Sequence, residues 1–227
     1  MSEKVSKFLT AVRVTTLVSI GAMAALSLMA WGQIPAGTLV PTHWGLSGQA
    51  DGFAPKEIAL WMIPAITAFV GVIFDVTLSR KSKEANLEKS LAVAGVSMFG
   101  TLALMVVVQG LIVFSALGHV LPVAQVVSAG LGVMLAATGL LIAMGKTSRN
   151  TAVGVRTPWT LSSDKAWAVT SRFSGSVMLA MGVAALVGAL LNSMVIISVS
   201  LVGGVLVLLV GSYAVSYLVA RSEQSST

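Results

Sequence analysis

The sequence contains no cysteine, and only 10% of its residues are charged. Without cysteine there is no disulfide framework, no thiol nucleophile and no cysteine-based metal site. A soluble domain carries about 25% charged residues, which it needs to cover its surface. A chain that is 56% hydrophobic and this poor in charge is therefore typical of an integral membrane protein.

Charge is absent from long parts of the chain. No Asp, Glu, Lys or Arg occurs in 14–50, 58–74, 90–145 or 173–220. A membrane-spanning helix needs about 20 apolar residues to cross about 30 Å of hydrocarbon. The first two stretches each have room for one helix and the last two for two, with breaks expected at Gly, Pro and Asn near 118–122 and 192–193. We predict an all-α polytopic membrane protein with six transmembrane helices and no separate soluble domain.

The basic residues predict the orientation of these helices. With six spans, every Lys and Arg except Lys56 falls at a terminus, in the second connection or in the fourth. Short loops rich in Lys and Arg stay in the cytoplasm. We therefore predict an N-in/C-in arrangement with the 33–57 loop outside and the 145–172 loop inside. The net charge of +6 follows this pattern, so we expect the lipid bilayer and not nucleic acid as the contacting surface. The first apolar run is longer than a signal-peptide core, so we expect an anchor.

The external loop is too long and too specific in composition to be a simple connector. One interpretation is an interfacial loop, with Trp44 at headgroup level and Asp51-Gly52 in a turn. The other is a recognition surface, because tryptophan gives a large amphipathic contact, and histidine and aspartate add directional hydrogen bonds. The candidate external recognition residues are Pro41, His43, Trp44, Gly48, Asp51, Gly52 and Lys56.

The only two histidines, His43 and His119, both fall on the predicted outer side, where Asp51 and Glu57 also lie. Imidazole and carboxylate groups suit zinc or a similar ion. The sequence has neither an H-x-x-H nor an H-E-x-x-H spacing, so we predict no metal site and no cofactor.

The internal loop also has two interpretations. Ser162 or Ser163 can cap a helix, with Asp164 in its first turn and the nearby tryptophans at the membrane interface. Alternatively, the segment is a docking surface for a cytoplasmic partner or an anionic ligand, anchored by Arg156. The candidate cytoplasmic motif consists of Arg149, Asn150, Gly154, Arg156, Thr157, Pro158, Trp159, Ser163, Asp164, Trp167 and Arg172.

Both loops carry a resemblance to known families. The outer pattern Pro41-x-His43-Trp44…Gly48-x-x-Asp51-Gly52-Phe53…Lys56 resembles the N-terminal membrane domain of unknown function found ahead of SdpI-type immunity proteins. The inner motif residues resemble the signature of the SdpI family itself. Two positions depart from the family: Gly45, where Asn is frequent, and Ser171, where a His is frequent between Thr170 and Arg172.

The resemblance implies a multi-pass protein of the bacterial cytoplasmic membrane that protects its cell against a secreted peptide toxin of the sporulation-delay type. From the best-known member it also implies signalling through a cytoplasmic regulator. It divides the chain into a two-helix region, 1–89, and a four-helix SdpI-like region, 90–227. The alternatives are a small transporter or lipid-handling protein and, more remotely, a metal-dependent membrane enzyme. The sequence shows no Ser/His/Asp set, paired carboxylates or P-loop, so we predict no enzyme.

Within the helices, small residues recur every four positions, which predicts close helix contacts inside one chain or in a homodimer. Asp75 is the one ionisable residue inside a predicted span, and we expect it to pair with Arg80 about one turn away. Gln109 is the strongly polar side chain near the middle of the third helix. The small residues are Ser176, Ala180, Ala184, Gly188 and Asn192 in the fifth helix and Ser128, Gly132 and Ala136 in the fourth.

Overall fold

The computed structural model describes residues 2–45, 48–84 and 86–225, and within them six helical segments are long and apolar enough to cross a membrane, which confirms the predicted all-α polytopic fold. The long helices are α1 (Glu3–Trp31), α2 (Lys56–Arg80), α3 (Leu91–Ala116), α4 (Val123–Ala143), α6 (Asp164–Leu190) and α8 (Gly204–Gln224). The short elements are β1 (Leu39–Trp44), β2 (Ala50–Pro55), the 3₁₀ turn η1 (Leu87–Ser90), α5 (Pro158–Ser162), α7 (Met194–Ser198) and the π-helical turn η2 (Val199–Gly203), the last two completing the sixth span.

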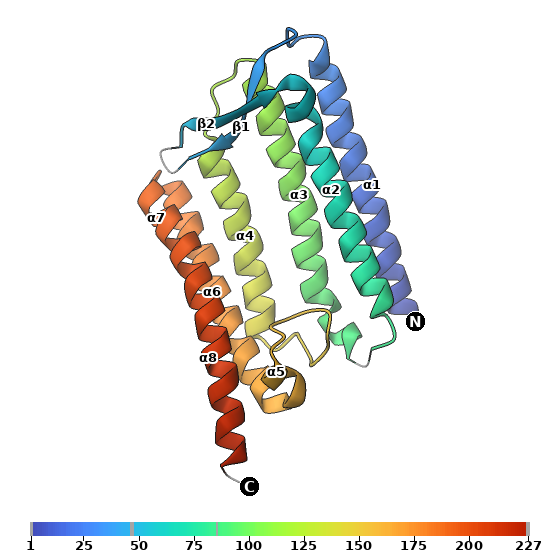
Figure 1. The fold of residues 1–227 in the computed structure, drawn as a ribbon, viewed down its shortest axis with the longest axis vertical. Coiled ribbons are helices and arrows are strands. Elements are labelled where there is room, and N and C mark those ends of the chain that lie inside the picture. The colour runs from blue at the N-terminus through green and yellow to red at the C-terminus, as the bar shows by residue number, and fades with distance from the viewer. Residues whose placement is uncertain (1, 46–47, 85, 226–227) are drawn as a thin grey trace.

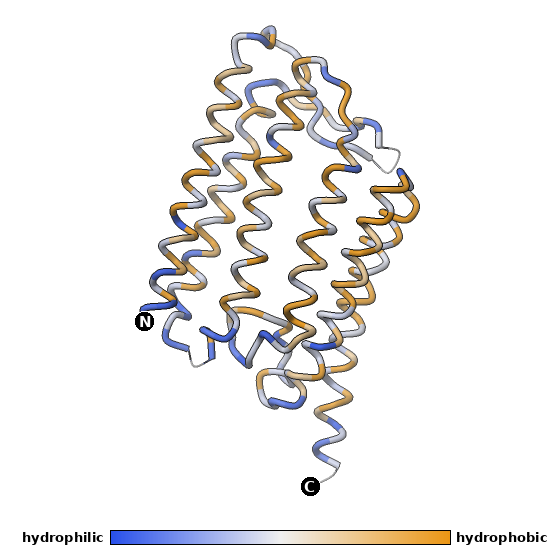
Figure 2. The backbone as a smooth tube through the Cα atoms, turned by 180° about the vertical axis from the view of Figure 1, so that it is seen from behind, coloured by the Kyte–Doolittle hydropathy of each residue, from blue (hydrophilic) through white to orange (hydrophobic). Residues whose placement is uncertain are grey.

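The long helices run side by side in two groups of three (Figure 1). One group is α1, α2 and α3, the other is α4, α6 and α8, and α3 contacts α4 between them. Both chain ends lie at the same end of the bundle, as an even number of spans requires (Figure 1). Hydrophobic residues predominate along the middle of the helices, whereas hydrophilic residues gather at the two ends of the bundle (Figure 2). The N-in/C-in orientation stays a prediction, made from the basic residues.

The loop predicted to be external forms an antiparallel hairpin of β1 and β2, which was not predicted. The prediction of a turn at Asp51-Gly52 was wrong, because both residues lie in β2, and Gly52 pairs with His43 of β1. A Cβ atom at Gly52 would lie 2.8 Å from the Cβ atom of His43. Glycine therefore allows the close strand approach at this irregular pairing. Pro55 ends β2 and leads directly into α2.

A polar cluster joins α1, α2 and α3. Pro64 lies inside α2 and has no N–H to donate to the carbonyl of Leu60, four residues earlier. That carbonyl instead accepts hydrogen bonds from Ser27 Oγ of α1 at 2.7 Å and from Gln109 Nε2 of α3 at 3.0 Å. Gln109 also donates to Ser27 Oγ at 2.8 Å. The midspan glutamine therefore helps to satisfy the backbone group that the proline leaves free.

Close contact between α4 and α6 is made by glycines seven residues apart. A Cβ atom at Gly139 would lie 2.7 Å from the Gly175 carbonyl oxygen, and one at Gly132 would lie 2.8 Å from that of Gly182. Seven residues make about two turns of 3.6, whereas a spacing of four drifts around the helix. The predicted contact inside the chain is confirmed at buried Ser128 and Gly132 in the fourth helix and at buried Gly188 in the fifth. Ser176 and Ala180 are exposed in the single chain, so the homodimer alternative stays a prediction there.

Asp75 does not pair with Arg80 as predicted. Its carboxylate accepts hydrogen bonds from Arg13 Nε at 2.7 Å and Arg13 Nη2 at 3.2 Å. Because α1 and α2 run in opposite directions, the start of one lies level with the end of the other. Local spacing therefore suggested the wrong basic partner.

Candidate functional site

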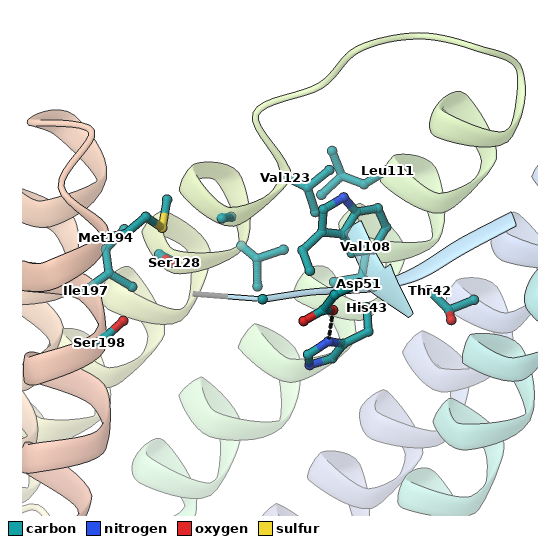
Figure 3. A pocket seen from close by; sticks show the side chains of 14 residues that line it. Thr42, His43, Asp51, Val108, Leu111, Val123, Ser128, Met194, Ile197 and Ser198 are labelled. Atoms are coloured by element: carbon teal, nitrogen blue, oxygen red, sulfur yellow. Dashed lines mark hydrogen bonds and ion pairs between the residues drawn. The ribbon is translucent and has the colours of Figure 1, made fainter. Parts of the chain in front are cut away.

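A pocket of about 520 Å³ opens between the two helix groups, at the end of the bundle that carries the hairpin. The hairpin forms one wall and α7 lies across from it, with the ends of α3 and α4 between them (Figure 3). The lining residues are Thr42, His43, Trp44, Gly45 and Asp51 from the hairpin segment, Val108 and Leu111 from α3, Val123, Ala124, Val127 and Ser128 from α4, and Met194, Ile197 and Ser198 from α7.

The pocket has one strongly polar pair in largely apolar surroundings. His43 Nδ1 lies 2.5 Å from Asp51 Oδ1, and both side chains are more than half exposed. The other polar side-chain groups are the hydroxyls of Thr42, Ser128 and Ser198 and the indole N–H of Trp44. Such a lining is suited to binding an apolar group and fixing its orientation through a few hydrogen bonds.

Gly45 explains one departure from the family pattern. A Cβ atom at this position would collide with the Asp51 carboxylate. Glycine therefore leaves space for the carboxylate that faces His43. An asparagine here would require Asp51 to move.

Trp44 belongs to both the pocket and the core. Its half-buried side chain lines the pocket and packs against a buried cluster that includes Met23, Ala59 and Ile112 from α1, α2 and α3. The indole is thus held against a buried cluster to which three helices contribute. A rigid aromatic group at a pocket wall is a favourable contact for an apolar ligand.

Lys56, a predicted recognition residue, lies elsewhere. It is only 7% exposed, and its ammonium donates to the Ile34 carbonyl at 2.6 Å and the Trp31 carbonyl at 3.2 Å. The same ammonium lies 4.9 Å from the centre of the Trp31 ring. Lys56 therefore stabilises the C-terminal end of α1, where carbonyls lack helical partners.

The other predicted outer residues shape the hairpin. Pro41 pairs with Phe53 across the strands. Gly48 has a φ of 76°, which favours glycine, and a Cβ atom there would lie 3.6 Å from Met194 Cε on the opposite wall. The structure thus brings His43, Trp44 and Asp51 together in the pocket. Sequence reasoning missed the walls from α3, α4 and α7, because their apolar residues look like any other membrane-facing segment.

The inner motif is organised around Asn150, which is 4% exposed. Its Oδ1 accepts from the backbone N–H groups of Ala152 and Val153 at 2.8 and 2.7 Å. Its Nδ2 donates to the Ser148 carbonyl at 2.6 Å and to Ser90 Oγ at 3.1 Å. One side chain therefore folds the loop and fixes it to the start of α3.

The turn around α5 is closed by reciprocal hydrogen bonds. Thr157 Oγ1 accepts from the Thr160 N–H at 3.2 Å, and Thr160 Oγ1 accepts from the Thr157 N–H at 2.9 Å. This is a capping box with Pro158 at the first helical position. Trp159, the next residue, packs edge-on against Tyr213 and Tyr217 of α8, at centroid distances of 5.0 and 5.2 Å.

The start of α6 confirms the predicted cap at Ser163, whose Oγ accepts from the Ala166 N–H at 3.0 Å. The same hydroxyl donates to Glu223 of α8 at 2.6 Å. Asp164 in the first turn pairs with Arg149, with Nε 3.0 Å from Oδ1. Trp167, predicted to lie at the membrane interface, is 3% exposed and packs inside the protein, where a Cβ atom at Gly154 would lie 2.9 Å from its ring.

A second contact ties the inner loop to the connection after α2. The Glu84 carboxylate accepts from the Thr151 N–H at 2.8 Å and also from the Thr151 hydroxyl. Partial burial opposes ionisation of Glu84, but the hydrogen bonds from Thr151 and the nearby Lys81 outweigh it and lower the pKa below the ordinary 4.5. The charged form of Glu84 therefore holds the two connections together.

Arg156 and Arg172 remain exposed at the inner end. Arg156 makes one internal hydrogen bond, from Nη1 to the Thr151 carbonyl at 2.9 Å. Most of the motif thus builds the loop, and its arginines at these two positions are available to other molecules.

Among the described residues, no cluster of three or more His, Cys, Asp or Glu side chains is placed to hold a metal ion. His119 instead packs edge-on against the Phe114 ring, with centroids 5.8 Å apart. The structure therefore does not bring His119 to the His43–Asp51 pair.

Comparison with known proteins agrees with the two motifs. Residues 146–219 match the SdpI/YfhL protein family, and residues 18–68 match a domain of unknown function, DUF1648. A curated relative, the immunity protein SdpI of Bacillus subtilis (strain 168), is 25% identical over 143 residues, which cover 63% of this chain and 65% of the relative. No solved structure matches the chain. The chain is thus a multi-pass membrane protein with six helices long and apolar enough to cross a membrane, and less than half of it, residues 146–219, is similar to the SdpI/YfhL protein family.

Proposed function

We propose that this protein is a non-enzymatic immunity protein of the bacterial cytoplasmic membrane that protects its cell against a secreted peptide toxin. The observation that carries this proposal is the match to the immunity protein SdpI over 63% of the chain. That match covers less than two thirds of the relative, so the shared activity is an inference from the family. The outer pocket supports it, because an immunity protein needs a site for an external molecule.

The pocket is the proposed binding site for the toxin. Its hairpin wall comes from the region that matches DUF1648 and its α7 wall from the region that matches the SdpI family. A ligand between them would contact both regions at once. Apolar walls would receive hydrophobic side chains of the toxin, and the His43–Asp51 pair would bond to a polar group of its backbone.

A cytoplasmic regulator is the proposed second partner. The inner segment leaves Arg156, Pro158, Lys165 and Arg172 exposed. An arginine binds carboxylate or phosphate groups through a planar pair of donors. A regulator with an acidic surface would fit this part of the molecule.

The function is tested by deleting the gene and challenging the cells with secreted peptide toxins. The deletion strain should be sensitive to one of them, and the wild-type gene should restore protection. His43→Ala, Trp44→Ala and Asp51→Ala should restore less, with Trp44→Ala the weakest, although all three are inserted in the membrane. Equal sensitivity of deletion and parent strains to every toxin would contradict the proposal. Toxin protection of purified vesicles only under an ion gradient would favour a transporter instead.

A further inference from the structure

A second groove, of about 400 Å³, lies between α1 and α2, away from the outer pocket. Leu17 and Val72 at its edges are 69% and 60% exposed. In a bundle of membrane-spanning helices, apolar side chains this exposed face lipid. The groove is lined by Leu17, Ile20, Ala68 and Val72 along its length, together with Arg13, Thr16 and Asp75.

The ion pair of Arg13 and Asp75 faces the same side. The Arg13 side chain is 54% exposed and that of Asp75 is 27% exposed. Ionisable side chains within a span almost always face the bundle interior or a water-filled cavity. This pair instead faces the outside of the bundle, and the charge-free stretch 14–50 begins directly after Arg13. We therefore place the pair at the boundary between headgroups and hydrocarbon, where lipid phosphates are found.

Thr16 provides an independent polar group one helical turn deeper. It is only 8% exposed, and its Oγ1 has no hydrogen-bond partner among the described residues. A buried hydroxyl without a partner costs free energy unless something satisfies it. Gly71 of α2 lies opposite, and a Cβ atom there would be 2.6 Å from Thr16 Cγ2. The glycine leaves room beside the threonine.

The three features follow one another along the groove. The charged pair comes first, the unpartnered hydroxyl of Thr16 follows, and the apolar walls at Ile20 and Ala68 are deepest, since α1 and α2 run in opposite directions. A phospholipid has the same sequence of groups: charged headgroup, ester carbonyl and acyl chain. The groove and a phospholipid therefore agree in the chemical groups they present and in the order of these groups with depth.

We propose that this groove is a specific site for a phospholipid with a zwitterionic, primary-amine headgroup, the chemistry of phosphatidylethanolamine. Arg13 donates to the lipid phosphate, and the lipid ammonium donates to Asp75. The Thr16 hydroxyl donates to an ester carbonyl, and one acyl chain lies along Leu17 and Val72. An anionic headgroup has no cation for Asp75, and the quaternary ammonium of phosphatidylcholine has no N–H to donate.

The test is native mass spectrometry of the full chain, released from nanodiscs with equal amounts of phosphatidylethanolamine, phosphatidylglycerol and phosphatidylcholine carrying identical acyl chains. Phosphatidylethanolamine should remain bound in excess. Thr16→Val keeps the side-chain shape and should weaken retention about fivefold, the value of one hydrogen bond. Arg13→Gln should abolish the preference.

The matched control is Lys7→Gln, which removes an exposed cation of the same helix that pairs with Glu3 and should leave retention unchanged. Equal retention of the three lipids, or preference for phosphatidylglycerol, would overturn the proposal. Unchanged retention in Thr16→Val would do the same, even if Arg13→Gln failed to fold.

Discussion

The outer hairpin and the inner loop differ in how they use their polar residues. The hairpin directs His43 and Asp51 into an open pocket, where both stay more than half exposed. The inner loop turns Asn150 and Thr160 inward, where they are 4% and 0% exposed and hold the backbone together. Two segments that look equally rich in candidate site residues therefore have different physical roles.

A long motif in a membrane protein is therefore not by itself a binding site. A loop at the end of a helical bundle must satisfy its own backbone groups. Asn150, Thr157 and Ser163 do so at the inner end. The outer loop satisfies its backbone groups by strand pairing, which leaves side chains free to face a ligand.

The different roles of the outer hairpin and the inner loop require that the two segments lie on opposite sides of the membrane. Because the chain has no cysteine, single cysteines report topology directly. We expect His119→Cys to react with an impermeant thiol reagent on intact spheroplasts, and Ser82→Cys and Ser162→Cys to react only after lysis. Ser47, another suitable outer position, lies outside the described residues. Labelling of Ser82→Cys from outside would contradict the predicted N-in/C-in orientation and place the inner loop outside the cell.

The largest stability effect is expected at the inner loop. Asn150→Ala leaves backbone groups of three half-buried residues without their partner side chain and should lower the free energy of unfolding by about 2–3 kcal/mol. His43→Ala, its outer counterpart, removes a side chain that is 72% exposed and should change stability by less than about 0.5 kcal/mol. Thermal unfolding in detergent measures both. Equal destabilisation by the two substitutions would contradict the different structural roles of Asn150 and His43.

A smaller, pH-dependent effect is expected at Glu84. Its pKa is lower in the folded protein than the ordinary 4.5, so its contact with Thr151 stabilises the fold above pH 4.5 and is lost as the pH falls through the lowered pKa. The hydrogen exchange of residues 148–153, divided by its intrinsic rate at each pH, should therefore rise on acidification. In Glu84→Gln this exchange should already be raised at neutral pH and should vary less with pH. An identical profile for both proteins would exclude this contact.

A small stability effect is also expected at Arg156, which is exposed and makes one internal hydrogen bond. Arg156→Lys should change the free energy of unfolding by about 0.5 kcal/mol or less. It should nevertheless impair signalling, because lysine lacks the planar pair of donors, whereas Lys165→Arg should be silent. Full signalling by Arg156→Lys would show that the inner loop has a structural role alone.

The helices could be predicted because long charge-free runs and their Gly, Pro and Asn breaks are local signals. The partners of single residues could not. Asp75 pairs with Arg13, which is distant in sequence, and Lys56 binds the end of α1 instead of a ligand. His43, Trp44 and Asp51 were predicted as recognition residues, but the pocket walls depend on how α3, α4 and α7 pack. Apolar periodicity does not reveal such packing.

The outer pocket is the proposed recognition site. Ser198 of α7 lines the pocket, whereas its neighbour Val199 does not and is 66% exposed on the lipid-facing surface. Ser198→Phe should fill part of the pocket, and Val199→Phe should only enlarge a contact with lipid. The decisive measurement is protection of a gene-deletion strain against the toxin to which it is sensitive, at equal amounts of membrane-inserted protein. We predict that Ser198→Phe fails to protect while Val199→Phe protects like wild type; equal protection by both would contradict the claim.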